Sequence, residues 1–277
     1  MNNDEAPPNV DPLRPLAGKK ALVSGAGRGI GAAIAIALAK AGAEVAVNDL
    51  NHPAETVEAC MKHGVRSIPA VADVGDYAAI QKTVNSVCEE LGGLDIMVSN
   101  AAFSDRQLFY QADMAGFEKT IQVCMWGPFY LAREAARRMI AQGTGGNMVF
   151  IGSPHAYTAY PGAMAYNMAK AALDQMARTA AVELAEHRIR VNIVHPGWTD
   201  TPGERKFFFE EELLRRGAAL PLGRLAAPED IANGVSFLCN PNSSYITGAT
   251  LSIDGGIVLP YQEMFRVNGR PDESTAN

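Results

Sequence analysis

The chain alternates between short apolar runs and longer tracts that carry apolar residues on one face. The short runs predict seven strands, which begin at Lys19 and then cover residues 44–47, 65–71, 94–99, 147–151, 189–194 and 249–253. The longer tracts predict helices at residues 32–41, 77–91, 113–142, 162–186, 204–217 and 228–240, the third of them broken near Gly127 and Pro128. Strands that alternate with such helices indicate a parallel sheet with helices on both faces and right-handed crossovers.

One core is expected, because no repeat or internal linker divides the 277 residues. Residues 18–256 are predicted to form this domain, with a lid over the substrate side at residues 202–225. The proline-rich residues 1–17 predict a flexible N-terminal arm, and residues 257–277 predict a short C-terminal tail that docks or frays.

A glycine-rich turn follows the first strand. Gly25, Gly29 and Gly31 come directly after the apolar run 21–23, and an alanine-rich helix follows them. Glycines there let the chain turn sharply, bring backbone amides close to a pyrophosphate, and let the helix lie close to the sheet. Asp49 ends the second strand 18 residues after Gly31, close to the ~20 expected of a carboxylate that binds a ribose. The segment therefore predicts dinucleotide binding in a single Rossmann-type doubly wound parallel α/β sheet of seven strands.

Composition and charge limit the kinds of partner that the protein can bind. The formal net charge is −6 and no basic run occurs, which argues against nucleic acid or an anionic membrane surface as the partner. No segment reaches ~18 uninterrupted apolar residues, and the first twenty residues lack the apolar core of a signal peptide, so a cytoplasmic location is expected. The four cysteines stand far apart and the five histidines show no paired spacing, so neither a disulfide framework nor a catalytic metal is expected.

Tyr166 and Lys170 lie four residues apart in the predicted helix 162–186, so both side chains share one face. A free tyrosine has a pKa near ~10, and acid–base chemistry near neutral pH requires a shift of roughly two to three units. An ammonium ~4 Å away contributes ~4 kcal/mol at an effective dielectric of ~20 but only ~1 kcal/mol in bulk water, so such a pair works only when shielded. For an isolated pair of this kind, the alternative is a partly buried tyrosine and a surface lysine placed by chance.

Ser153 makes the pattern specific, because it stands just past a predicted strand and thirteen residues before Tyr166. Further motifs are the turn SGAGRGIG, Asp73 before Val74, NAA at residues 100–102, PG at residues 196–197 with Thr201, and the closing segment 221–256. With these motifs, residues 18–256 resemble the short-chain dehydrogenase/reductase family. The resemblance implies a nicotinamide-dependent oxidoreductase that acts on an alcohol or carbonyl substrate.

The resemblance also implies roles for individual residues. Ser153 would hold the substrate oxygen, Tyr166 would exchange the hydroxyl proton, and Lys170 would bind the nicotinamide ribose and lower the pKa of Tyr166. The cofactor would contact Gly25, Arg28, Gly29, Ile30, Gly31, Asp49, Leu50, Asp73, Val74, Asn100, Ala101, Tyr166, Lys170, Pro196, Gly197, Thr199 and Thr201. A homotetramer built from the helices at 113–142 and 162–186 and the last strand is implied in the same way.

Asp49 and Arg28 bear on the choice of dinucleotide. A carboxylate at the end of the second strand accepts both ribose hydroxyls and repels a 2′-phosphate, whereas an arginine in the glycine turn can contact that phosphate. Arg28 is equally consistent with a solvated residue at the helix start, and Leu50, not a base, follows Asp49. NAD is therefore the predicted cofactor, with NADP less favoured.

The chain departs from the family pattern at Cys124, where the family usually carries an asparagine three residues before the glycine of the long helix. That asparagine is understood to act through its backbone carbonyl at a helix kink, as part of a proton relay, so a cysteine could keep the bend. We expect a working enzyme. The departure leaves open a different class, a catalytically idle dinucleotide-binding protein that acts as a sensor or scaffold.

The substrate would lie against the loops near the catalytic residues, at Ser104, Ser153, His155, Tyr160 and Trp198. His155 could hydrogen-bond a substrate hydroxyl or be merely solvated. Phe207, Phe208 and Phe209 in the lid could close on an apolar substrate or pack the lid onto the body or a neighbouring subunit, and the charged residues 204–206 and 210–212 are expected on a solvated face.

The first hypothesis is an NAD-dependent dehydrogenase of a secondary alcohol such as a sugar or polyol, and the second is an NADPH-dependent reductase of 3-oxoacyl or other ketone groups.

Overall fold

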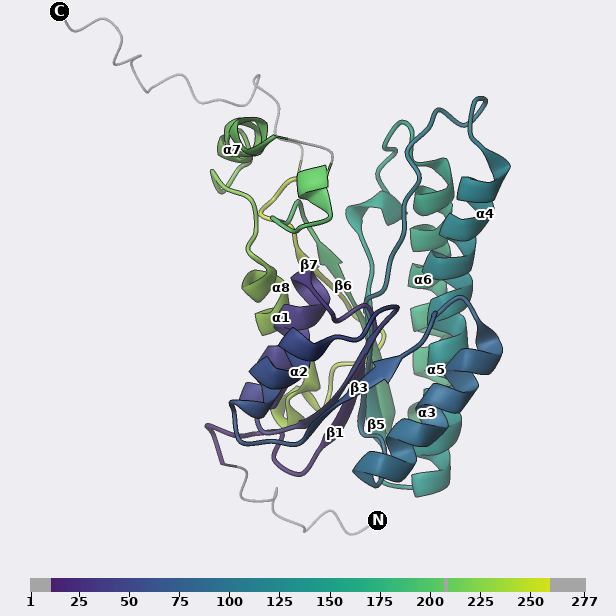
Figure 1. Cartoon of the computed structure of the whole chain (residues 1–277), viewed down its shortest axis with the longest axis vertical. Coiled ribbons are helices and arrows are strands. Elements are labelled where there is room, and N and C mark those ends of the chain that lie inside the picture. The colour runs from purple at the N-terminus through teal and green to yellow at the C-terminus, as the bar shows by residue number, and fades with distance from the viewer. Residues whose placement is uncertain (1–10, 207–208, 260–277) are drawn as a thin grey trace, which may run out of the picture.

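The computed structural model describes residues 11–206 and 209–259, and these contain seven parallel strands in one sheet (Figure 1). The strands are β1 (Lys20–Val23), β2 (Glu44–Asp49), β3 (Ser67–Val71), β4 (Ile96–Ser99), β5 (Gly146–Ile151), β6 (Ile189–Pro196) and β7 (Thr250–Ile253). Their order across the sheet is β3-β2-β1-β4-β5-β6-β7, and every neighbouring pair is parallel. The predicted doubly wound α/β fold is confirmed.

The direction in which the sheet is built reverses between β1 and β4. From β1 the chain extends outward to β2 and β3, then returns to β4 beside β1 and extends the other way to β7. The loops that follow β1 and β4 therefore diverge, and in sheets of this kind ligands bind in the crevice between such loops. Because all strands run the same way, the loops after them meet at one edge of the sheet.

Helices cover both faces of the sheet. On one face lie α1 (Gly29–Lys40), α2 (Ala54–Met61) and α8 (Pro228–Cys239), and on the other α3 (Tyr77–Leu91), α5 (Gly127–Gln142) and α6 (Met164–Glu183) (Figure 1). α4 (Met114–Ile121) lengthens the second layer, and α7 (Glu210–Ala218) lies beyond the carboxyl edge of the sheet. Neighbouring residues of β1 face opposite layers, with Val23 in the core beneath α1 and α8 and Leu22 in the core beneath α3 and α5. The strands are apolar on both faces, which explains their unbroken apolar runs.

Helix α2 has no counterpart in the predicted elements. The polar segment after Asp49 shows little helical periodicity, because α2 buries only Thr56, Val57 and Cys60. A crossover from β2 to a parallel β3 nevertheless needs a connection across the face of the sheet. The start of α1 also differs, since the helix begins at Gly29 and not at residue 32.

The expected break near Gly127 and Pro128 is wrong. α4, a π-helical segment at Gln122–Trp126 and α5 follow one another without interruption. Pro128 lies in the first turn of α5, where the missing N–H of a proline is tolerated best. The irregularity of this long helical tract is therefore one wide turn and not a gap.

The ends and the lid differ in part from expectation. Residues 11–17 form turns and not a loose arm, since Leu16 is only 1% exposed and its N–H donates to the Ala41 carbonyl at 2.9 Å. The lid contains a short 3-10 turn at Glu204–Lys206 followed by α7. The expectations for residues 1–10, 260–277, Phe207 and Phe208 lie outside the described residues, and Phe209 is exposed.

Candidate active site

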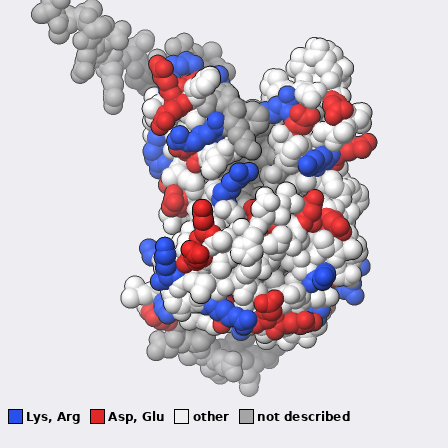
Figure 2. Space-filling model, viewed as in Figure 1, with Lys and Arg blue, Asp and Glu red and all other residues white. Residues whose placement is uncertain are grey.

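A cavity of about 710 Å³ lies beyond the carboxyl ends of the strands. Its walls come from the glycine turn, from the loops after β2, β3, β4, β5 and β6, from α6 and from the lid. On the face drawn in Figure 2 the surface is hollowed at this end of the molecule, and acidic and basic residues are interspersed around it. Sites for small molecules and cofactors occupy ~300–1,000 Å³, so the cavity is large enough for an extended ligand.

The glycine turn presents its backbone to this cavity. Gly25 and Gly29 have φ angles of 60° and 59°, in the left-handed region that glycine adopts readily. α1 starts at Gly29, and no described side chain caps it and no acidic residue lies in its first turn. The partial positive charge of the helix start is therefore available to an anion such as a pyrophosphate.

Gly31 packs the turn and is not among the residues that line the cavity, so its contact with the cofactor stays a prediction. A Cβ at position 31 would lie 2.2 Å from the Gly25 carbonyl oxygen and 2.5 Å from Asn100 Nδ2. Asn100 Nδ2 donates to the carbonyls of Ser24 at 3.1 Å and Gly25 at 2.9 Å, which ties the turn to the loop after β4. Only glycine lets the helix approach this joint.

Asp49 lines the cavity at the end of β2. Its Oδ2 accepts from the Gly27 N–H at 2.9 Å and its Oδ1 accepts from the Leu50 N–H at 2.8 Å. A Cβ at position 27 would lie 2.8 Å from Oδ2, so Gly27, which sequence reasoning missed, makes this contact possible. The two amides fix the carboxylate while leaving lone pairs for a ligand hydroxyl.

The other predicted cofactor residues line the same cavity. From the glycine turn and the loops after the strands these are Gly25, Arg28, Gly29, Ile30, Leu50, Asp73, Val74, Asn100, Ala101, Pro196, Gly197, Thr199 and Thr201. An amide-rich turn, a fixed carboxylate at the end of β2 and a long cavity fit a nicotinamide dinucleotide.

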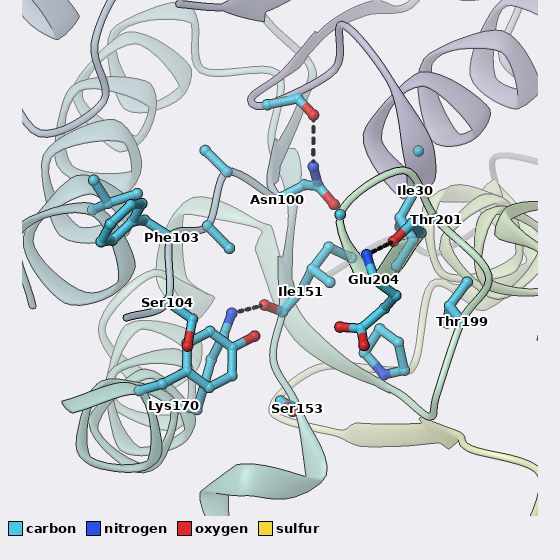
Figure 3. Close-up of a pocket in the computed structure, with 18 of the residues that line it drawn as sticks. Ile30, Asn100, Phe103, Ser104, Ile151, Ser153, Lys170, Thr199, Thr201 and Glu204 are labelled. Atoms are coloured by element: carbon cyan, nitrogen blue, oxygen red, sulfur yellow. Dashed lines mark hydrogen bonds between the residues drawn. The ribbon is translucent and has the colours of Figure 1, made fainter. Parts of the chain in front are cut away.

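Ser153, Tyr166 and Lys170 also line the cavity, as Figure 3 shows for Ser153 and Lys170. Ser153 follows β5, and α6 carries Tyr166 and Lys170 one turn apart. Ser153 Oγ accepts from the His155 N–H at 3.3 Å. Lys170 Nζ donates to the Ile151 carbonyl at 2.6 Å and lies 5.3 Å from the centroid of the Tyr166 ring. The arrangement gathers two hydroxyls and an amine in one shielded corner.

Burial has the largest effect on the pKa values of Tyr166 and Lys170. It raises the pKa of Tyr166 above its usual value, the Cys124 thiol adds to the rise, and the hydrogen bond with Ser153 opposes it. Burial lowers the pKa of Lys170, while Cys124 and Asp174 raise it. In the chain by itself the net shift of the Tyr166 pKa is upward, because enclosure disfavours the phenolate. The lowering of this pKa by Lys170, which the family resemblance implies, stays a prediction.

Cys124 lies fully buried in the π-helical segment. Its Sγ donates to the Phe103 carbonyl at 3.1 Å and accepts from the Phe103 N–H at 3.3 Å. Burial raises the pKa of this thiol, which favours the protonated form that can donate. Since Phe103 lines the cavity, the thiol joins the irregular helix to the cavity wall.

The predicted substrate residues Ser104, His155, Tyr160 and Trp198 all line the cavity. His155 Nδ1 lies 2.6 Å from Asn167 Oδ1, and Asn167 Nδ2 donates to the Tyr160 carbonyl at 3.0 Å. The His155 ring stacks on Tyr160 with centroids 4.0 Å apart. His155 is therefore held by a network and is not merely solvated.

Glu204 lines the cavity and was expected on a solvated face, which is wrong. Its Oε2 accepts from Trp198 Nε1 at 3.0 Å, and its Oε1 lies 3.2 Å from Arg106 Nη2. Its N–H donates to Thr201 Oγ1 at 3.4 Å (Figure 3). Arg106 and Arg216 also line the cavity, and the sequence carries no local motif that singles them out.

Within residues 11–206 and 209–259, no group of three or more His, Cys, Asp and Glu side chains could hold a metal ion. No helix in these ranges is long and apolar enough to cross a membrane.

The fold and the site together define a class. A doubly wound sheet whose cavity runs from a glycine turn and a strand-end carboxylate to a Ser–Tyr–Lys corner belongs to an oxidoreductase that uses a nicotinamide dinucleotide. A family model described as enoyl-(acyl carrier protein) reductase matches residues 25–258. The chain is a member of the short-chain dehydrogenase/reductase family, whose enzymes act on CH–OH groups.

Individual relatives match along nearly their whole length. L-rhamnose 1-dehydrogenase (NAD(P)(+)) of Sphingomonas sp. (strain SKA58) is 34% identical, covering 90% of this chain and 100% of the relative. The 3-oxoacyl-(acyl-carrier-protein) reductase of Aquifex aeolicus (strain VF5) is 33% identical, covering 87% and 98%. A crystal structure of a short-chain type dehydrogenase/reductase from Mycobacterium marinum has a TM-score of 0.84 at 33% identity and covers 90% of this chain and 98% of that one.

Proposed function

We propose that this protein is an NAD-dependent dehydrogenase that interconverts a secondary alcohol and a ketone, with a sugar or polyol as its substrate. The observation that carries the cofactor choice is the Asp49 carboxylate, which two backbone amides fix at the wall of the cavity. A carboxylate at the end of β2 accepts hydrogen bonds from ribose hydroxyls and repels a 2′-phosphate.

Ser153, Tyr166 and Lys170 are the catalytic residues of this proposal. Ser153 donates a hydrogen bond to the substrate oxygen, and Tyr166 takes up or returns the proton of that oxygen. Lys170 binds the nicotinamide ribose, and its ammonium favours the phenolate form of Tyr166. When bound, the oxidised dinucleotide supplies the hydride acceptor and a second positive charge near the phenol. Water is largely excluded, because Ser153 is 8% and Lys170 3% exposed.

His155 supports a substrate with more than one hydroxyl. Asn167 commits its amide nitrogen to the Tyr160 carbonyl, so His155 Nδ1 donates to the amide oxygen and Nε2 is left as an acceptor. Burial lowers the pKa of His155, which favours this neutral ring. A neutral acceptor two residues from Ser153 suits a hydroxyl next to the reacting carbon, and one relative is named for a sugar.

The second candidate is an NADPH-dependent reductase of 3-oxoacyl or other ketone groups. Arg28 also lines the cavity and can contact a 2′-phosphate, and one relative is named as a 3-oxoacyl reductase. The two candidates share the catalytic residues and differ in dinucleotide and substrate.

Steady-state kinetics separates the candidates. The purified chain is assayed by dinucleotide absorbance with NAD or NADP against L-rhamnose, D-glucose, sorbitol and 2-butanol, and with NADPH against a 3-oxoacyl thioester. We expect the highest kcat/KM with NAD and a polyhydroxylated substrate. A higher kcat/KM with NADPH and the thioester would establish the second candidate. Dinucleotide binding without turnover of any substrate would favour the idle sensor or scaffold.

A substitution tests the hydroxyl contact. His155→Phe keeps a flat ring but removes Nε2, so kcat/KM should fall at least tenfold for the sugar while the value for 2-butanol changes little. An equal fall for both substrates would mean that His155 supports the fold of the loop and does not select hydroxyls.

We also propose a homotetramer. Trp126 and Phe129 are 42% and 43% exposed and pack edge to face with ring centroids 6.1 Å apart, forming an apolar surface at the start of α5. Exposed apolar surface of this kind is typical of association sites. Sedimentation as a stable monomer at micromolar concentration would contradict the assembly.

A further inference from the structure

A buried polar pair lies behind the catalytic corner and has no role in the reaction proposed above. His195 in β6 is 0% exposed, Asp174 in α6 is 8% exposed, and His195 Nε2 lies 2.8 Å from Asp174 Oδ1. Because a carboxylate oxygen accepts, Nε2 carries the proton and donates. His195 Nδ1 is buried without a hydrogen-bond partner among the described residues. His195 therefore holds the Asp174 carboxylate through Nε2.

His195 packs directly against the backbone that carries the catalytic serine. A Cβ at Gly152 would lie 2.4 Å from His195 Cδ2 and 2.7 Å from its Nε2, so only glycine fits there. Gly152 immediately precedes Ser153, and its N–H donates to the Val194 carbonyl at 2.7 Å. The imidazole thus sits between β6 and the loop that positions the Ser153 hydroxyl.

Asp174 belongs to the helix that carries the other two catalytic residues. It follows Lys170 by four residues in α6, which places both side chains on one face of the helix. The hydrogen bond to His195 therefore ties α6 to β6 one turn away from the catalytic amine.

Few groups act on the charge of Lys170, which is 3% exposed. Those that face it are the Cys124 thiol from the π-helical segment, the Ile151 carbonyl from β5, the Tyr166 ring and Asp174 from its own helix, and, through Asp174, His195 from β6. Burial lowers the pKa of Lys170 and Asp174 raises it. Asp174 is the carboxylate among these groups of the described residues.

We propose that Asp174 and His195 are positioning residues of the dehydrogenase reaction: their hydrogen bond fixes α6 against the Ser153 loop, and the Asp174 carboxylate, one helical turn from Lys170 on the same face of α6, stabilises the Lys170 ammonium. The proposal concerns the reaction common to the family and is independent of the choice of NAD or of a sugar. Arg178 provides a matched control, because its Nη2 lies 3.7 Å from Asp174 Oδ2 but its side chain is 53% exposed. Solvent screens an exposed pair of this kind.

The test measures the titration of Lys170 directly. Protein labelled with ¹³C at lysine Cε is titrated by NMR without substrate or dinucleotide, and the Lys170 signal is assigned by its loss in Lys170→Arg. Asp174→Asn keeps an oxygen that accepts from His195 but removes the charge. We expect the pKa of Lys170 to fall by about one unit in Asp174→Asn and to stay unchanged in Arg178→Ala.

Activity provides the second readout. In Asp174→Asn the alkaline limb of the kcat–pH profile should move to lower pH, since Lys170 loses its proton earlier, while the profile of Arg178→Ala overlays that of the native protein. An unchanged Lys170 pKa in Asp174→Asn would overturn the proposal even if kcat fell. Because the NMR titration uses no substrate, a lack of turnover with sugars would contradict the proposed function and not this inference.

A double variant keeps the test decisive if Asp174→Asn is unstable. Asp174→Asn with His195→Gln replaces the pair by two amides that can still hydrogen-bond, and it should show the same fall in the Lys170 pKa. If neither variant folds, the pair serves the stability of the fold alone, and its role in positioning is refuted.

Discussion

Replacing Cys124 by alanine tests whether the thiol at the usual asparagine position holds the cavity wall. The change deletes the Sγ that donates to the Phe103 carbonyl and accepts from the Phe103 N–H, at a site with 0% exposure. A buried backbone group left without a partner costs about 1–3 kcal/mol. Sulfur is a weak partner and both contacts are only part-buried, so we expect a total near the cost of one such group. For a chain of this size that corresponds to a Tm roughly 2–5 °C lower.

Calorimetry of Cys124→Ala, Cys124→Ser and the native protein measures this effect. The serine hydroxyl keeps a donor and an acceptor, so Cys124→Ser should lose less than Cys124→Ala. An alanine variant as stable as the native protein, or a serine variant as unstable as the alanine one, would refute the reasoning from hydrogen bonds.

Cys124→Asn tests activity, which the dinucleotide absorbance assay measures. Asparagine adds volume to a closed site, which costs about 1–3 kcal/mol when a core is overpacked. We therefore expect turnover within about tenfold of the native value. A gain of many orders of magnitude would show that the cysteine cripples the native chain.

Three further predictions concern the cofactor end and the core. Asp49→Asn keeps the size of the side chain but removes its charge. Since hydrogen bonds to charged groups contribute about 1.5–3 kcal/mol, the ratio of kcat/KM with NAD to kcat/KM with NADP should fall at least tenfold. An unchanged ratio would mean that other residues discriminate between NAD and NADP. Gly31→Ala brings a Cβ within 2.2 Å of the Gly25 carbonyl oxygen and should abolish dinucleotide binding measured by calorimetry, whereas Gly203→Ala, whose nearest contact is 3.5 Å, should bind normally. Burial raises the pKa of Cys239 from 9.0 to about 12, so the unfolded thiol ionises first and the free energy of unfolding should fall as pH rises through this range. Cys239→Ala should lose less stability over the same range in urea titrations, and an identical loss would contradict the assignment.

The fold follows from the sequence because its strongest signals are local. Unbroken apolar runs in strands buried on both faces, and amphipathic tracts such as Tyr77–Leu91, mark their elements without tertiary information. Helix α2 is not predicted in this way, since its three buried side chains are too few to form a recognisable amphipathic pattern. The continuity across Gly127 and Pro128 also escapes it, because a proline in a first helical turn looks the same in sequence as a proline that ends a helix.

The candidate site divides in the same way. Ser153, Tyr166, Lys170 and the strand-end loops lie at fixed offsets from their elements, so the sequence pattern brings them to one cavity. Glu204 lines that cavity because the lid folds back onto Trp198 and onto Arg106, which stands 98 residues earlier in the chain and carries no sequence motif. The pKa of Tyr166 depends on enclosure by the whole fold, and spacing within a helix carries no information about that.

The π-helical segment at Gln122–Trp126 sets the rotation of α5 about its own axis. A π turn spends one residue more than an α turn, and each residue of an α-helix advances the rotation by about 100°. Deleting one residue here would straighten the tract into ordinary helix but would rotate α5 about its axis, taking Leu131, Ala135 and Met139 off the sheet. This short segment can therefore accept substitutions but not an insertion or a deletion.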